Sequence, residues 1–124
     1  MDTRPTNKEM EILRVLWQRG PSSVRDVHAE LAERNDTGYT TVLKLMQIMA
    51  EKGLVARDEE NRAHIYSASV TEADAQSTLV DDLVAKAFGG SAHKLALHAL
   101  GSKQATQEEL DEIRALLDQM GGKK

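Results

Sequence analysis

The chain has 124 residues, no cysteine and a formal net charge of −4 at pH 7. Its length suggests one domain, or one domain with a small appendage, and the lack of cysteine excludes disulfides, thiolate metal sites and cysteine redox switches. No apolar run reaches the ~18 residues that a membrane span needs, and the polar stretch MDTRPTNKEME resembles no signal peptide, so we expect a soluble, cytoplasmic protein that does not enter the membrane.

Composition indicates the class of fold, and charge limits the kinds of partner that the protein can bind. Aromatic residues and prolines are scarce, while Ala, Leu, Glu and Lys are abundant, which favours a mainly helical protein. The acidic balance argues against a protein built mainly to bind nucleic acid, because residues 1–70 carry ten Lys/Arg against eleven Asp/Glu and residues 71–124 carry six against nine. Any DNA binding must therefore come from local placement of cations.

The first predicted helix covers residues 8–19. Thr6 and Glu9 form a capping-box pattern at its start, and Gly20 ends it ahead of a proline. Its inner stripe consists of Met10, Leu13, Leu16 and Trp17. We interpret Trp17 as a core anchor rather than as part of a site.

A second helix is predicted over residues 24–33, with Ser22 or Ser23 as its N-cap. One side of it is apolar and also carries His28. This histidine is open to interpretation as a ligand, but a position at the border of the core is the better explanation. A polar turn then leads into the next helix.

The third predicted helix, residues 39–52, is the most informative stretch. Stepping 100° per residue places Leu45, Met46 and Met49 on one face around Val42. The opposite face carries Thr40, Lys44, Gln47 and Glu51. A DNA major groove is wide enough to admit a helix of this size, about 21 Å long, and hydroxyl, ammonium and amide groups can hydrogen-bond base edges there. An ordinary surface helix with a solvated polar side would show the same pattern.

A β-hairpin is predicted after the third helix. Residues 54–57 and 62–69 are short and rich in β-prone residues, and a charged tip, residues 58–61, separates them. Three short helices followed by a hairpin describe a winged helix-turn-helix domain. We therefore expect a mainly α protein with a small β-hairpin.

Three more helices are predicted in residues 71–124, one ending near Phe88, a short one after Ser91, and a last one after the capping-box pattern of Thr106 and Glu109. Such thin helices cannot bury their apolar stripes alone, so we expect a two-fold symmetric homodimer, with folding back onto the first domain as the alternative. The stripe residues assigned to dimerisation are Leu79, Leu83, Phe88, Leu110, Ile113 and Leu117. The predicted division is a winged-helix domain at 1–70 and a dimerisation region at 71–124.

No catalytic constellation is present in the sequence. It contains no Gly-rich phosphate loop, no HExxH pair and no nucleophile elbow. His93 and His98 are five residues apart and do not share a helix face well, so a metal site is not expected there. We predict a protein that is not an enzyme and needs no cofactor.

The ordered segments EMEILRVLW, SVRDVHAEL, YTTVLKLMQIMAEKGLV and RAHIY resemble the penicillinase-repressor (BlaI/MecI/CopY) family, with a looser match at FGGS and ELDEIRALL. The resemblance implies a homodimeric repressor that binds a dyad-symmetric operator of double-stranded DNA, with two recognition helices about 34–36 Å or a multiple apart. The positions matching the base-reading surface are Thr40, Thr41, Lys44 and Gln47. The expected phosphate contacts are Arg57 and Arg62 of the wing, and Ser22 and Ser23 with the first amides of the second helix.

Three departures from the family pattern affect what the resemblance implies. Ile48 takes a place where many members carry Arg, and the wing tip Asp58-Glu59-Glu60 is acidic. Members released by a membrane sensor protease carry an Asn-Phe cleavage pair, whose matching place here is about His98-Ala99, so cleavage at such a pair is not expected. Copper sensing through C-terminal cysteine pairs is excluded because the chain has no cysteine.

Two alternative functions are compatible with the same pattern. A winged helix can bind a partner protein with its polar face, and the acidic balance of the chain favours this interpretation. A small-ligand sensor, with its pocket between the winged helix and the C-terminal helices, is the second alternative.

Overall fold

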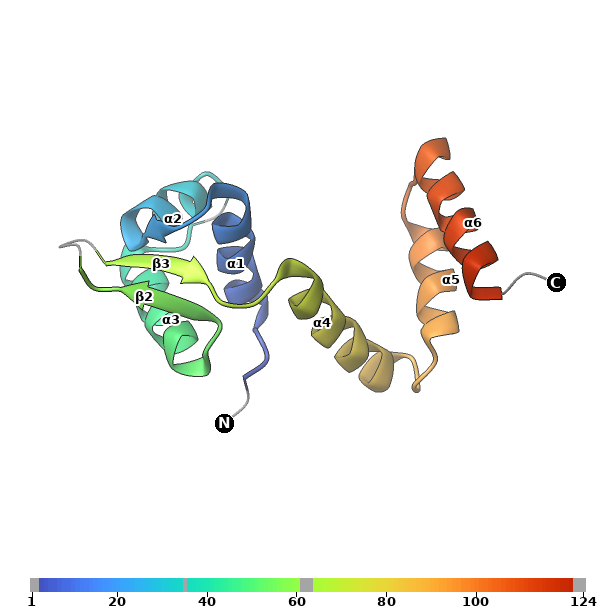
Figure 1. Ribbon diagram of the computed structural model, residues 1–124, viewed down its shortest axis with the longest axis horizontal. Coiled ribbons are helices and arrows are strands. Elements are labelled where there is room, and N and C mark those ends of the chain that lie inside the picture. The colour runs from blue at the N-terminus through green and yellow to red at the C-terminus, as the bar shows by residue number, and fades with distance from the viewer. Residues whose placement is uncertain (1–2, 35, 61–63, 122–124) are drawn as a thin grey trace. The chain divides into compact units, whose positions relative to one another are not determined.

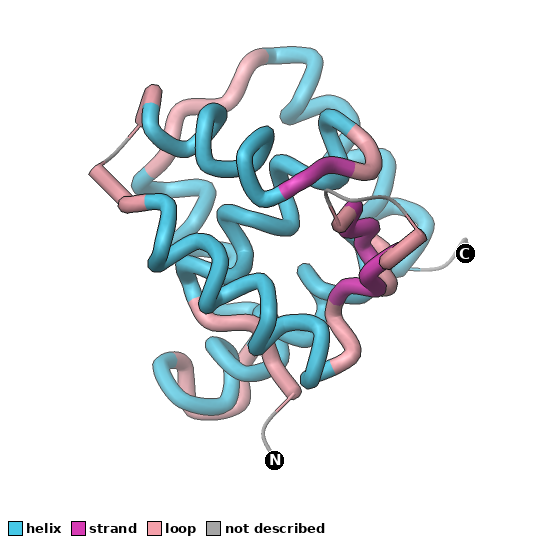
Figure 2. Tube along the Cα trace, turned by 90° about the vertical axis from the view of Figure 1, so that its left-hand side faces the viewer, coloured by secondary structure: helices cyan, strands magenta, loops and turns pink. Residues whose placement is uncertain are grey.

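The computed structural model describes residues 3–34, 36–60 and 64–121. The described residues form six helices and three strands, shown in Figure 1. In chain order they are α1 (Asn7–Arg19), β1 (Ser22–Ser23), α2 (Val24–Ala32), α3 (Tyr39–Lys52), β2 (Val55–Asp58), β3 (Ile65–Ala68), α4 (Glu72–Ala87), α5 (Ala92–Ser102) and α6 (Gln107–Gly121). Figure 2 shows how short the strands are beside the helices, so the mainly α class is confirmed.

The chain divides into two compact units, residues 1–82 and 83–124. The first unit holds α1 to β3 and the larger part of α4. The second unit holds the end of α4 together with α5 and α6.

The ends of α1 are as the sequence predicts. The Thr6 hydroxyl accepts a hydrogen bond from the Glu9 amide at 3.2 Å, and the Glu9 carboxylate accepts one from the Thr6 amide at 2.9 Å. Together these bonds satisfy two amides that the helix itself leaves without partners. At the other end Gly20 adopts a φ of 91°, a conformation that side chains with a Cβ rarely take.

The start of α2 differs from the prediction in one respect. Ser23 is the N-cap, and Ser22 and Ser23 also form the two-residue strand β1, which pairs antiparallel with β3. The sheet order is β1-β3-β2. Strand β1 was not predicted, because two residues are too few to show the alternation that identifies a strand.

The wing is the hairpin of β2 and β3. Their antiparallel register pairs Val55 with Ala68 and Asp58 with Ile65. Gly53, in the left-handed region at φ 83°, ends α3 and turns the chain into β2. Three helices followed by this hairpin confirm the winged helix-turn-helix fold.

The core of the first unit lies between the helices and the sheet. It is built from thirteen buried side chains: Ile12, Leu13, Val15, Leu16, Val24, Val27, Leu31, Val42, Met46, Met49, Leu54, Val55 and Tyr66. Trp17 packs against this cluster while its indole N–H donates to the Val70 carbonyl at 3.0 Å. His28 is half-buried, and its ring meets that of Tyr39 edge-on at a centroid distance of 5.8 Å. Both residues therefore have the structural positions that the sequence predicts.

The second unit has capped helices, but none of its described residues, 83–121, is buried. Ser91 caps α5, and the Thr106–Glu109 capping box is present, with hydrogen bonds of 2.8 and 3.1 Å. No residue of α5 or α6 is buried over the described bounds of these helices. Across the described part of the chain, no helix combines the length and apolar character that crossing a membrane requires.

Candidate nucleic-acid interface

The two faces of α3 have opposite environments. Val42, Met46 and Met49 are fully buried at 0% exposure, so the helix packs firmly onto the core of the first unit. The outer face is exposed at Thr40, Thr41, Lys44 and Gln47. These four are the residues predicted from the sequence to contact DNA bases. Their donor and acceptor groups are available to solvent or to a ligand.

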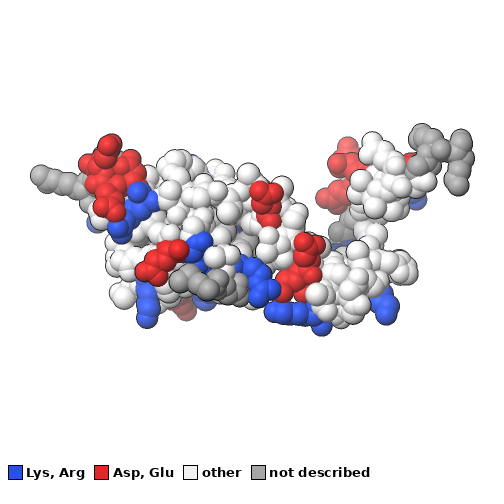
Figure 3. All heavy atoms as spheres, turned by 60° about the horizontal axis from the view of Figure 1, so that its bottom comes forward, with Lys and Arg blue, Asp and Glu red and all other residues white. Residues whose placement is uncertain are grey.

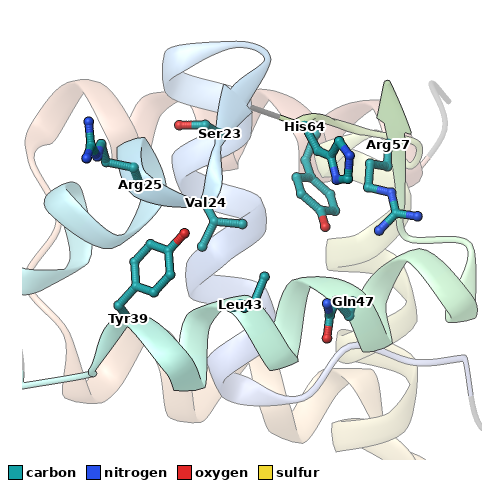
Figure 4. A pocket seen from close by; sticks show the side chains of 9 residues that line it. Ser23, Val24, Arg25, Tyr39, Leu43, Gln47, Arg57 and His64 are labelled. Carbon is teal, nitrogen blue, oxygen red and sulfur yellow. The ribbon is translucent and has the colours of Figure 1, made fainter. Parts of the chain in front are cut away.

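Beside this face lies a groove of about 710 Å³, shown in Figure 4. Its lining comes from three places: the start of α2, the outer side of α3, and the wing. The lining residues are Ser23, Val24, Arg25, Tyr39, Leu43, Gln47, Arg57, His64 and Tyr66. The structure thus brings Ser23, Gln47 and Arg57 to one hollow, whereas Thr40, Thr41 and Lys44 do not line it.

Three exposed residues of the groove were not assigned to a site from the sequence. Arg25 is the second residue of α2, Tyr39 is the first residue of α3, and His64 lies just before β3. In Figure 4, Arg25 and Tyr39 stand on the α2 side, and His64 stands beside Arg57 on the wing. Arg25 and Tyr39 each adjoin a predicted helix start. No sequence signal shows that α2, α3 and the wing meet around one hollow.

Arg57, expected to contact phosphate, already has an anionic partner. Its Nε donates to Glu59 Oε2 at 3.0 Å, and its Nη2 donates to the same oxygen. This hydrogen bonding to Glu59 raises the pKa of the Arg57 guanidinium, and the Tyr66 side chain contributes further. The same pair lowers the pKa of the Glu59 carboxyl. The wing cation is therefore partly neutralised within the chain.

The expectation for Ser22 is corrected by the structure. Ser22 is only 1% exposed, and its hydroxyl donates to the Gly20 carbonyl at 2.8 Å. It also accepts a hydrogen bond from Arg19 Nε at 3.2 Å. A buried hydroxyl with both bonds made has no access to a DNA phosphate. Ser22 serves the turn between α1 and α2 instead.

Ser23 is half-buried at the groove, where it shares the N-terminus of α2 with a carboxylate. Its hydroxyl accepts from the Asp26 amide at 3.1 Å, and Asp26 Oδ2 accepts from the Ser23 amide at 3.3 Å. These bonds from the Ser23 amide and side chain lower the pKa of Asp26, so the group is anionic near neutral pH. A negative charge here disfavours a phosphate at the first amides of α2, which weakens the predicted anion site.

The surface charge of the chain is mixed. In the face shown by Figure 3, acidic and basic side chains alternate, and no continuous basic field is seen. Asp58, Glu59 and Glu60 at the wing are all exposed. Arg62, the second expected wing cation, lies outside the described residues. Among the described residues, no three His, Asp or Glu side chains are close enough together to hold a metal ion.

A core-anchored third helix with a polar outer face, flanked by a hairpin wing, defines a winged helix-turn-helix protein. The sequence model of the family described as penicillinase repressor matches residues 5–119. The chain belongs to the penicillinase-repressor family.

Relatives with names in this family match over nearly the whole chain. The transcriptional regulator BlaI of Mycobacterium tuberculosis is 32% identical over 120 residues, which cover 95% of this chain and 86% of that protein. The methicillin resistance regulatory protein MecI of Mammaliicoccus sciuri is 22% identical over 91% of this chain and 92% of its own length. The penicillinase repressor of Bacillus licheniformis is 20% identical over 96% of this chain and 93% of its own length.

A solved structure shares the fold. It is the solution structure of the Bacillus licheniformis BlaI monomeric form in complex with the blaP half-operator. The TM-score is 0.51 at 21% identity, and the match covers 57% of this chain and 87% of that one. The winged-helix architecture found here is therefore also the architecture of a protein solved on DNA.

Proposed function

We propose that this chain is a transcriptional repressor that binds an operator in double-stranded DNA as a homodimer. It acts in the cytoplasm, without catalysis and without a cofactor. Family membership supports this proposal, because the named relatives are a transcriptional regulator, a methicillin resistance regulatory protein and a penicillinase repressor. The fold shared with a half-operator complex supports DNA as the ligand.

One observation carries the proposal: α3 buries Val42, Met46 and Met49 completely and exposes a polar face on the opposite side. A helix held this way can enter a major groove without disturbing the core. The residues proposed to read bases are Thr40, Thr41, Lys44 and Gln47. Their hydroxyl, ammonium and amide groups match the donors and acceptors on base edges.

Backbone contacts are proposed around the groove beside α3. Arg57 and Arg25 line it, and the sequence places Arg62 between β2 and β3. Ser23 also lines the groove, but the Asp26 carboxylate bonded to it makes Ser23 the weakest of these contacts. Phosphate contacts of this kind fix the position of the protein on DNA and carry no sequence information. They also make affinity depend on salt, because each neutralised phosphate releases a counterion.

Dimerisation is proposed through the C-terminal helices. Leu83 and Leu117 are exposed, as are Leu97, Leu116 and Met120, and α5 and α6 contain no buried residue within their described bounds. The other assigned positions, Leu79, Phe88, Leu110 and Ile113, are half-buried. So many exposed apolar side chains are typical of an interface. A second copy would cover them, and residues 71–124 would then be the dimerisation region beside a winged-helix domain at 1–70.

The proposal is tested by capturing fragments of the source genome with the purified full chain and sequencing them. A repressor enriches a few sites with two-fold symmetric sequences. On such a site, Lys44→Ala should weaken binding by about 1–3 kcal/mol, because a contact to a base edge is lost. Lys94→Ala removes the same charge from α5 in the second unit and should leave affinity unchanged. Equal losses in the two variants would remove Lys44 from the base-reading surface.

A winged helix that binds a partner protein is the rival function, favoured by the net charge of −4. Salt titration separates the two, since DNA affinity should fall by orders of magnitude between low and moderate salt. The ligand-sensor alternative has less support. A cavity in the first unit, beside the end of α3 and the start of α4, is about 210 Å³, below the ~300 Å³ typical of small-molecule sites.

Release from DNA by cleavage at an Asn-Phe pair is not proposed. The matching position, His98-Ala99, has a different sequence and lies within helix α5. A protease needs an extended backbone at the cleaved bond, so α5 would first have to unwind. Incubation with a sensor protease of the family should therefore leave the chain intact.

A further inference from the structure

We propose that Glu59 competes with the DNA backbone for Arg57, so that the wing reaches DNA only by exchanging an internal ion pair for a phosphate contact. This inference rests on the proposed DNA binding and assigns a role to an acidic wing residue. It explains how a wing with an acidic tip can serve a DNA-binding protein.

The local structure holds Glu59 against the guanidinium. Two nitrogens of Arg57, Nε and Nη2, donate to the single oxygen Oε2 of Glu59. Asp58 Oδ1 accepts from the Glu60 amide at 2.9 Å, a turn that carries Glu59 just beyond the end of β2. The carboxylate partner is thus supplied two residues along the chain, and the Tyr66 side chain on β3 also hydrogen-bonds Arg57.

Arg57 lies where two hollows meet. One is the groove beside α3, of about 710 Å³, which Arg57 shares with Gln47 and Ser23. The other, of about 520 Å³, is lined by Arg57 and Gln47 as well, and also by Glu59. Glu59 does not line the first groove. A guanidinium that leaves Glu59 therefore remains beside the groove, where the phosphate contacts are proposed (Figure 4).

The pair is suited to exchange because it is exposed. The side chains of Arg57 and Glu59 are 33% and 60% exposed, and ion pairs in contact with water are individually weak. Protonation does not open the pair near neutral pH, because the hydrogen bond from Arg57 lowers the pKa of Glu59. A phosphate must displace the carboxylate, and the freed carboxylate then lies close to the phosphate and repels it.

The test is a double-mutant cycle on the full chain. The probe is a fluorescent duplex of mixed sequence, about 30 base pairs long, because backbone contacts need no operator sequence. Binding is followed by anisotropy at several salt concentrations for the wild type, Glu59→Gln, Arg57→Ala and the double variant. Glu60→Gln is the matched control, since it removes the same charge from the neighbouring exposed position.

We expect Glu59→Gln to bind DNA more tightly than wild type at low salt, by up to about fivefold, the upper limit set by a weak exposed ion pair. Glu60→Gln should raise DNA affinity by a smaller factor. In the Arg57→Ala background, Glu59→Gln should raise DNA affinity by no more than Glu60→Gln raises it in the wild type, because no guanidinium remains to be released. This result would support the exchange.

Two other results would overturn the inference. If Glu59→Gln gains as much in the Arg57→Ala background as in the wild-type background, the carboxylate acts only by general repulsion of DNA. If the gains of Glu59→Gln and Glu60→Gln are equal in the wild-type background, Glu59 has no special role. Failure of the proposed function looks different, because the wild type itself would then show no salt-dependent binding to the duplex, and the inference would fall with it.

Discussion

The two units of this protein use the same kind of helix with opposite results. In the first unit, the apolar stripes of α1, α2 and α3 close over one another and over the sheet, and side chains such as Leu13 and Met46 are fully buried. In the second unit, α5 and α6 carry stripes of comparable length, yet neither has a buried residue within its described bounds. An amphipathic pattern predicts that a face will be covered, but it does not say by what.

The largest expected effect on this contrast between the units comes from creating a cavity in the core of the first unit. Leu13→Ala should cost about 3–4 kcal/mol of unfolding free energy, because Leu13 has no exposed surface. Met120→Ala, at a side chain 73% exposed, should change it by less than about 0.5 kcal/mol when the chain is monomeric. Urea unfolding followed by the far-UV circular dichroism of the helices reports on both units, while the fluorescence of the single tryptophan, Trp17, reports on the first. Similar losses in both variants would contradict the contrast between the units.

The next largest effect concerns the ion pair between α1 and α3. Lys52 Nζ lies 2.7 Å from Glu9 Oε1, and Glu9 is only 2% exposed. Lys52→Ala should cost about 3 kcal/mol, because it leaves a buried carboxylate without its counterion. The same unfolding measurement checks it, with the exposed Lys103→Ala as control. A loss no greater than that of the control would show that water compensates Glu9 fully.

The second unit is tested through its association. Leu117→Asp should weaken the proposed dimer by about 2 kcal/mol, roughly thirtyfold, because a charge replaces an apolar contact. Gln119→Asp adds the same charge at a polar position of α6 and serves as control. Sedimentation at micromolar concentration measures both. A wild type that sediments as a monomer there would refute the dimer outright.

The smallest expected effect concerns Asp26, at the start of helix α2 in the first unit. Bonding to Ser23 lowers the pKa of Asp26 below its ordinary 3.8, so the folded state favours the carboxylate. This stabilisation is fully present above the unfolded pKa and is lost as pH falls through the lower folded pKa. Thermal melting from neutral to acid pH should show that the wild type loses more stability than Asp26→Asn does. Parallel curves for the two proteins would contradict this assignment.

Local patterns account for most of what was predicted correctly. The capping boxes at Thr6 and Thr106, the buried face around Val42 and the hairpin after Gly53 each depend on residues close together in sequence. The errors share a different origin. Ser22 was expected at the surface, but pairing with β3, more than forty residues away, places it inside. Arg25, Tyr39 and His64 were missed because only folding brings them to one groove.

By itself, the sequence determined the helices and their ends, the winged-helix order, and the polar side of α3, because hydrogen bonding and side-chain periodicity act within a few residues. Only the tertiary structure decided which of those features are accessible. It buried Ser22, joined Arg57 to Glu59 beside the groove, and left α5 and α6 without a buried residue over their described bounds. Accessibility depends on contacts between distant segments, and a local pattern does not contain them.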